Sequence, residues 1–166
     1  MDAATEQRLA ALEQRLQAAE DRLTILDLLN TYGPLVDSAQ GNAAAALWEA
    51  GGSYAFVYEG ELKHLTAPGE LAPMYGWPGH LELVETGVSH FTGTPRIMLD
   101  GDSAKAVGYS FVVLRNTAGE GWNVWRAAVN RWLLTRTETG WKIAERRSVP
   151  LDGSELSLAT MKEVLS

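Results

Sequence analysis

The chain has 166 residues, 46% of them hydrophobic and 21% charged, a composition typical of one folded domain. It contains no cysteine, which excludes disulfides, zinc–cysteine sites, iron–sulfur clusters and thiol nucleophiles. A net charge of −7 without a basic stripe argues against nucleic-acid binding. Since we find neither a signal peptide nor a run of about 18 apolar residues, we expect a cytoplasmic protein that does not span a membrane.

Leucines at heptad spacing predict a long helix over residues 4–31. The steps between them alternate between three and four residues, which forms a seam of a and d positions. We interpret residues 1–20 as a helical extension that packs on a partner subunit, although it could instead fold back on its own domain. Gly33-Pro34 predicts a kink or break near Tyr32, because proline lacks an amide hydrogen and disfavours helical geometry in the preceding residue. The seam residues are Leu9, Leu12, Leu16, Ala19, Leu23 and Leu26.

Residues 21–166 are expected to form a single α+β domain. Its first elements are a helix over 43–50 capped by Asn42, a hairpin with strands over 53–58 and 61–65 around a turn at Glu59-Gly60, and a short helix over 80–86. Well-marked turns then predict four strands of an antiparallel meander, over 88–99, 103–115, 122–135 and 141–148. A closing helix over 154–165, with Ser154 as its N-cap, completes the domain.

The order of these elements and several short segments resemble the SnoaL-like branch of the nuclear transport factor 2-like superfamily. The segments that carry the resemblance are 25–32 with Asp37, 45–48, 87–91, 99–104, 130–132, and 140–144 with 146–147. The resemblance implies a cone-shaped antiparallel sheet, an α+β barrel, wrapped around the N-terminal helices and an apolar pocket. It also implies a dimer or trimer, and the heptad extension supports a homo-oligomer formed through that helix and the sheet. The reaction stays open, because this fold carries dehydratases, isomerases, cyclases, oxygenase small subunits and non-catalytic proteins.

His90 is the candidate base, because a neutral imidazole is well suited to accept a proton near pH 7. Strand alternation places it on one face with Val88, although it could be a core histidine bonded to a backbone carbonyl or an exposed one on the outer face. The resemblance implies that Asp37 pairs with His90 and orients its ring. It further implies that Tyr32 donates a hydrogen bond to a substrate oxygen. A surface turn for Asp37 and an ordinary core position for Tyr32 are the alternatives.

Further side chains are candidate substrate contacts. Asn130 is a polar residue in an apolar strand and could bind a substrate oxygen or face outward. Arg147 shares strand parity with Trp141 and Ile143, so it either enters the pocket to hold an anion or, as we favour, pairs with Glu145 outside. Large apolar side chains either fill the core or line a pocket for a flat hydrophobic ligand. They are Tyr54, Phe56, Trp77, Met98, Tyr109, Phe111, Trp125 and Trp132.

No metal or cofactor is expected, because the three histidines lack zinc-site spacing and no phosphate loop or nucleophile elbow is present. His80 is expected as an exposed helix cap, although it could lie at the pocket mouth, and His64 is expected as a surface residue. We predict a cofactor-independent lyase, isomerase or cyclase that acts on a small hydrophobic, cyclic substrate by acid–base chemistry of His90 and Asp37. The alternatives are a non-catalytic ligand-binding or assembly protein, and the small subunit of a ring-hydroxylating oxygenase.

Overall fold

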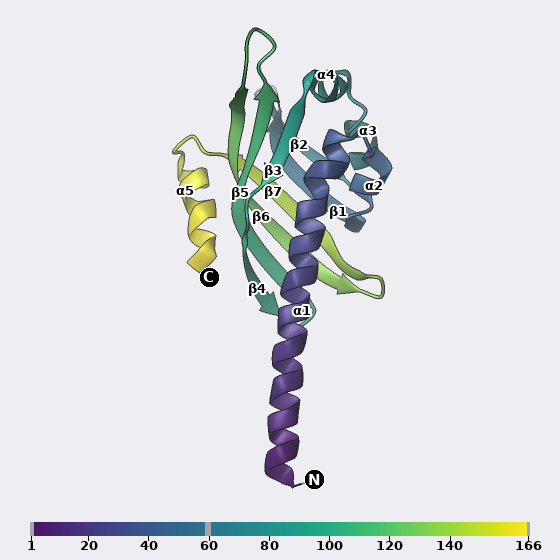
Figure 1. The fold of residues 1–166 in the computed structure, drawn as a ribbon, viewed down its shortest axis with the longest axis vertical. Helices are drawn as coiled ribbons and strands as arrows, with labels where there is room; N and C mark the ends of the chain where they lie inside the picture. The colour runs from purple at the N-terminus through teal and green to yellow at the C-terminus, as the bar shows by residue number, and fades with distance from the viewer. Residues whose placement is uncertain (1, 59–60, 166) are drawn as a thin grey trace.

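The computed structural model describes residues 2–58 and 61–165 and shows a curved seven-stranded sheet wrapped around one long helix (Figure 1). The predicted turn at Glu59-Gly60 lies outside these residues. The helices are α1 (Ala3–Asp37), α2 (Gly41–Ala45), α3 (Leu71–Met74), α4 (Pro78–Thr86), α5 (Glu155–Lys162) and the 3₁₀ turn η1 (Glu163–Leu165). The strands are β1 (Trp48–Tyr58), β2 (Glu61–Thr66), β3 (Val88–Thr92), β4 (Arg96–Asp100), β5 (Ser103–Arg115), β6 (Trp122–Thr137) and β7 (Gly140–Pro150).

The strands follow the order β2-β1-β7-β6-β5-β3, and β4 also pairs with β5. The pairings are antiparallel except that of β1 with β7, which is parallel. The α+β class is confirmed, but the prediction of a purely antiparallel sheet was wrong at this one pairing. A parallel pair needs a long crossover, and the strands and helices between β1 and β7 supply it.

Helix α1 runs through Gly33-Pro34 to Asp37, so of the predicted kink or break near Tyr32, the break does not occur. Because Pro34 has no amide hydrogen, one carbonyl of the preceding helical turn has no partner within the helix. Pro34 lies on the exposed side of the helix, where water can hydrate that carbonyl. The next helix was predicted too long and with the wrong cap. It spans only Gly41–Ala45 after an N-cap at Gln40, because Trp48 already pairs with Ile143 of the sheet.

The predicted strand 88–99 is two strands, β3 and β4, separated by residues 93–95. Both pair with β5, whose predicted bounds of 103–115 were correct. Strands β6 and β7 are each longer than predicted. The closing helix is correctly capped, since the Ser154 hydroxyl accepts a hydrogen bond from the amide of Ser157.

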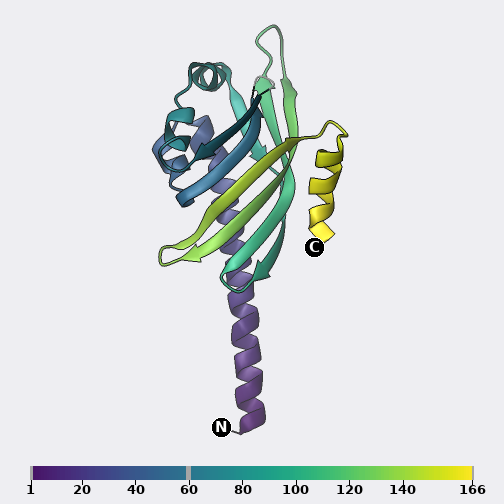
Figure 2. The same cartoon turned by 180° about the vertical axis from the view of Figure 1, so that it is seen from behind.

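The main core lies between α1 and the facing side of the sheet, and a smaller cluster around Val107, Val129 and Val149 lies on the opposite side with residues of α5 and η1. Figure 2, seen from behind, shows α5 on that outer side. Residues 3–20 of α1 extend beyond the sheet in both views. None of the described helices is long and apolar enough to cross a membrane.

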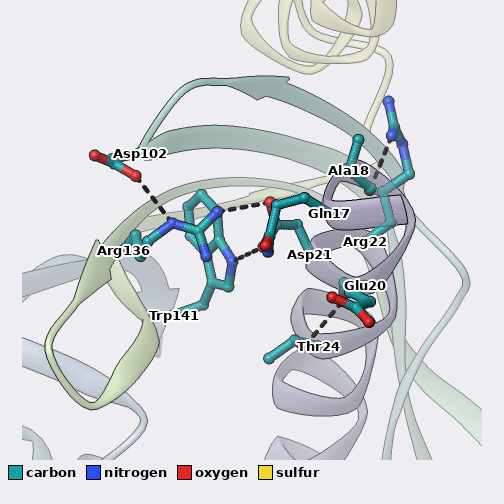
Figure 3. Close-up of polar contacts among 9 residues, drawn as sticks. All are labelled: Gln17, Ala18, Glu20, Asp21, Arg22, Thr24, Asp102, Arg136 and Trp141. Carbon is teal, nitrogen blue, oxygen red and sulfur yellow. Dashed lines mark hydrogen bonds and ion pairs between the residues drawn. The ribbon is translucent and has the colours of Figure 1, made fainter. Parts of the chain in front are cut away.

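Asp21 anchors α1 where the helix meets the sheet (Figure 3). Its buried carboxylate accepts hydrogen bonds from Arg136 Nη2 at 2.6 Å and Trp141 Nε1 at 3.1 Å. The guanidinium of Arg136 also stacks over the Trp141 ring and binds Asp102 at 2.9 Å. The hydrogen bond from Arg136 lowers the pKa of Asp21, so the carboxylate stays charged in its buried position.

Candidate active site

The site is assembled where α1 crosses β3. Gly33 packs against the backbone carbonyl of His90, and a side chain at position 33 would overlap that oxygen. Glycine therefore lets the helix lie directly on the strand. Asp37 follows one helical turn later, which places its carboxylate over His90.

Asp37 holds His90 at two points. The amide of His90 donates to Asp37 Oδ2 at 2.8 Å, and His90 Nδ1 lies 2.6 Å from Asp37 Oδ1. Since the carboxylate can only accept, Nδ1 carries a proton and the neutral ring keeps its lone pair on Nε2. Both side chains are 20% exposed, so the pair is neither sealed in the core nor free at the surface. The arrangement fixes the ring and its tautomer.

His80 lies beside this pair instead of forming the exposed cap that the sequence predicts. Its ring centre is 5.6 Å from that of His90, and its Nε2 lies 3.2 Å from the carbonyl oxygen of Val36. Because a carbonyl accepts, His80 donates from Nε2 and keeps a lone pair on Nδ1. Burial lowers the pKa of His80, so the ring stays neutral near pH 7. His64 is exposed, as predicted.

A pocket with a cavity of about 100 Å³ opens beside the two histidines. An outer hollow of about 450 Å³ shares part of its wall, including Tyr58, Leu83 and Trp125. The predicted ligand contacts Tyr54, Phe56, Trp77, Phe111 and Trp125 lie in the wall of the inner cavity, together with Tyr32. Tyr109 instead points to α5, where its hydroxyl contacts Met161, and Trp132 is fully buried in the core.

Arg146 supplies a buried positive charge in the pocket wall. It is 4% exposed, and its guanidinium lies 4.5 Å from the ring centre of Tyr32 and 4.6 Å from that of Tyr54. Among the ion pairs of the described residues, none includes Arg146. Aromatic faces therefore stabilise this cation without neutralising it.

Asn130 lies behind the lining instead of contacting the pocket, so its predicted substrate contact was wrong. Its amide oxygen accepts from Arg146 Nε at 3.0 Å, and its amide nitrogen donates to Ser110 Oγ at 2.7 Å. Asn130 is fully buried, and its bond to Arg146 fixes the guanidinium of that residue, which does line the pocket.

Arg147 is absent from the pocket wall, in line with the favoured alternative, and Arg146 lies there instead, because β7 contains a bulge. Leu133 pairs with Glu145 and Leu134 pairs with Ile143, so Ala144 is an extra residue. Beyond it the inward face changes from odd to even numbers, and Arg146 takes the inward position. Glu145 pairs with Arg131 and not with Arg147.

The predicted ligand contact of Met98 was also wrong, again because an irregularity along the strand changes which side chains face the pocket. The break at residues 93–95 changes the alternation, so Ile97 and Leu99 face the main core. Met98 faces the opposite side of the sheet and packs in the cluster near α5. A single uninterrupted strand would have placed Met98 on the same face as His90.

Tyr32 lies in the pocket wall on the helix turn before Val36. Burial raises its pKa to about 12. The phenol therefore stays protonated at neutral pH and can donate a hydrogen bond. Burial also raises the pKa of the neighbouring Tyr75.

Sequence reasoning missed Arg146 and Ser148 as pocket residues, and it gave the pocket mouth only as the alternative position of His80. Only the position of the bulge at Ala144 could have assigned Arg146 and Ser148, and no local signal marks it. No three histidine, aspartate or glutamate side chains gather as a candidate metal site anywhere in residues 2–58 and 61–165.

Comparison with solved structures gives several similar folds. An NTF2-like protein with a cystatin-like fold from Novosphingobium aromaticivorans is 32% identical, with a TM-score of 0.85 over 92% of this chain and 96% of that one. A protein from the same organism, described as the beta subunit of a putative aromatic-ring-hydroxylating dioxygenase, is 17% identical, with a TM-score of 0.64 over 80% and 90%. ActVI-ORFA from Streptomyces coelicolor is 12% identical, with a TM-score of 0.65 over 78% and 96%.

Comparison with curated protein sequences gave no match. The SnoaL-like domain family matches residues 17–147, which is most of the chain and includes Asp37, His90 and Arg146. The matched span agrees with the resemblance found in the sequence and with the fold of the neighbouring structures. The chain therefore belongs to the SnoaL-like family of the nuclear transport factor 2-like superfamily.

Proposed function

We propose that this protein is a cofactor-independent enzyme that removes a proton from a carbon next to a carbonyl group in a small hydrophobic, cyclic substrate. His90 is the base, and the reaction is an elimination, isomerisation or cyclisation. The observation that carries the proposal is that His90 lies in the wall of an apolar pocket and its Nδ1 is 2.6 Å from Asp37 Oδ1. A carboxylate at Nδ1 leaves Nε2 as the basic nitrogen and stabilises the imidazolium that forms.

In the proposed reaction, His90 Nε2 takes the proton from the substrate carbon. The C–H electron pair moves toward the carbonyl, whose oxygen becomes an enolate. The enolate then expels a leaving group, takes up a proton at another carbon, or attacks a second carbon to close a ring. Each outcome returns a proton from imidazolium to product, leaving group or solvent, so the enzyme ends in its starting state.

Arg146 and Tyr32 provide the positive field and the donor that an enolate oxygen needs. Arg146 is a buried cation in the pocket wall, held in place by Asn130. Tyr32 stays protonated because burial raises its pKa to about 12. In this scheme Asn130 is a positioning residue.

The pocket size limits the part of the substrate in the inner cavity to one ring at most. A space of about 100 Å³ is smaller than the roughly 150 Å³ cavities that admit benzene, so the wall must adjust slightly around a ring. Any larger part of the substrate would extend into the outer hollow of about 450 Å³, past Trp125.

Proton abstraction can be tested before the natural substrate is known. We would incubate the protein with a panel of one-ring and two-ring cyclic ketones in D₂O and follow deuterium uptake at the α-carbon by NMR. We expect uptake that His90→Gln abolishes and Asp37→Asn slows by about 10–100-fold. His64→Gln is the matched control, because His64 is exposed on β2 and should leave the rate unchanged.

The same experiment separates the enzyme from a binding protein. If ketones bind without exchange at the α-carbon, and His90→Gln leaves their affinity unchanged, the protein is a carrier with the same pocket. Exchange that persists in His90→Gln would rule out His90 as the base. Copurification with a larger oxygenase chain would favour the small-subunit function.

A further inference from the structure

Helix α1 carries two apolar faces on opposite sides. Ile25, Leu29 and Val36 are buried against the sheet. At 100° per residue, Leu23 lies about 160° around the helix from Ile25, and the seam that contains Leu23 faces away from the sheet. Figure 1 shows α1 in front of the sheet, with no other element over its near side. The seam leucines are exposed by 46% (Leu9), 49% (Leu12), 60% (Leu16) and 63% (Leu23).

The charges beside this seam are sorted by sign. With Leu9, Leu16 and Leu23 at heptad position a, every e position from 6 to 27 is acidic and every g position from 8 to 22 is arginine. None of these charges has an opposite charge three or four residues away, so they do not pair along the helix. The ion pairs found among the described residues include none of them. The e residues are Glu6, Glu13, Glu20 and Asp27, and the g residues are Arg8, Arg15 and Arg22.

This pattern selects one orientation for two copies. In a parallel coiled coil, each g residue lies next to the e residue five positions later in the other helix. Arg8, Arg15 and Arg22 of one copy would then face acidic residues of the other. In an antiparallel pair, g faces g and e faces e, so arginines would face arginines and glutamates would face glutamates. Like charges at these positions are destabilising.

We propose that residues 9–26 of α1 form a parallel, two-stranded coiled coil with a second copy of this chain. The seam faces away from the sheet, so both domains lie on the outside of the coil and do not obstruct it. The Asp21–Arg136 bond holds part of this segment in place, which lowers the ordering cost of a seam only about two and a half heptads long. This proposal is independent of the catalytic one.

Cysteine cross-linking tests the orientation directly, because the natural chain has no cysteine. In a parallel coil the two Leu12 side chains meet at a d position, so Leu12→Cys should form a disulfide-linked dimer under mild oxidation. Gln14→Cys is the matched control, since position 14 is exposed on the same segment but faces away from the seam. Sedimentation of the natural chain should give twice the monomer mass.

Charge reversal tests the pairing. Arg15→Glu should raise the dimer Kd by about tenfold or more, because it sets a carboxylate at position 15 of each copy against Glu20 of the other. Adding Glu20→Arg should restore the dimer, with circular dichroism confirming an unchanged fold. A monomer or trimer in sedimentation, equal cross-linking at positions 12 and 14, or a dimer indifferent to Arg15→Glu would overturn the proposal.

Discussion

Gly33 of α1 lies directly against the backbone carbonyl of His90 in β3. This contact lets Asp37 reach across from the next helical turn and bind both the amide and the ring of His90. Asp37 and His90 are 53 positions apart in the chain, and the absence of a side chain at Gly33 leaves room for the close approach of α1 and β3. The geometry of the site therefore depends on Gly33, a residue without a side chain.

Gly33→Ala is expected to destabilise the protein by about 1–3 kcal/mol, because the new methyl group overlaps the His90 carbonyl. The loss should appear although alanine favours a helix by about 1 kcal/mol over glycine. Denaturant unfolding measures it, and NMR of the His90 Nδ1 proton reports whether Asp37 still binds. Gly69→Ala is the control, since the space at its Cβ position is open. A Gly33→Ala protein as stable as the natural chain would disprove the close approach.

Asn130→Leu is expected to lower the free energy of unfolding by about 1–3 kcal/mol. The change removes the hydrogen-bond partner of Ser110 Oγ and that of Arg146 Nε, which is buried. Ser110→Ala should cost less, since it removes only one hydroxyl. A double-mutant cycle, measured by urea unfolding of the two single variants and the double variant, isolates the contribution of the Asn130–Ser110 hydrogen bond to stability. Once Asn130 is replaced, Ser110→Ala should cost clearly less than it does alone. Strictly additive costs would show that the Asn130–Ser110 bond contributes nothing.

Asp21→Asn should lower stability at neutral pH and matter less in acid. Arg136 lowers the folded pKa of Asp21 below its ordinary 3.8, so the stabilisation is fully present above pH 3.8. It is lost as the pH falls through the lower folded value. Unfolding midpoints at pH 7 and pH 3 for the variant and the natural chain check this, with the exposed Asp100→Asn as control. A stability difference that did not shrink in acid would contradict the expectation.

His80→Gln should make stability less sensitive to mild acid. Burial holds the folded pKa of His80 below 6.5, so below pH 6.5 the unfolded chain binds a proton that the folded protein resists. The His80 contribution is therefore present above pH 6.5 and declines as the pH falls. Thermal unfolding at pH 8 and pH 5 should show a smaller change in Tm for His80→Gln than for the natural chain. The exposed His64→Gln is the control for the loss of a histidine.

Local signals in the sequence were sufficient for the order of the elements. The bounds of β5 and the Ser154 cap depend on turn residues and side chains next to them in the chain, and both were predicted correctly. The family was also correctly identified, because many short segments recur in the right order. Strand alternation placed His90 on one face with Val88 without deciding which way that face points, and the structure places His90 in the pocket wall.

By itself the sequence determined the α+β class, the SnoaL-like family and the heptad pattern of α1, because periodicity and turn chemistry are properties of neighbouring residues. Only the tertiary structure decided that α1 continues through Gly33-Pro34 to Asp37 and that Arg146, not Arg147, faces the pocket. A single extra residue in β7 reverses the facing of the side chains that follow it. Such an irregularity is set by how strands pair across the sheet, and the pairing partners are far apart in the chain.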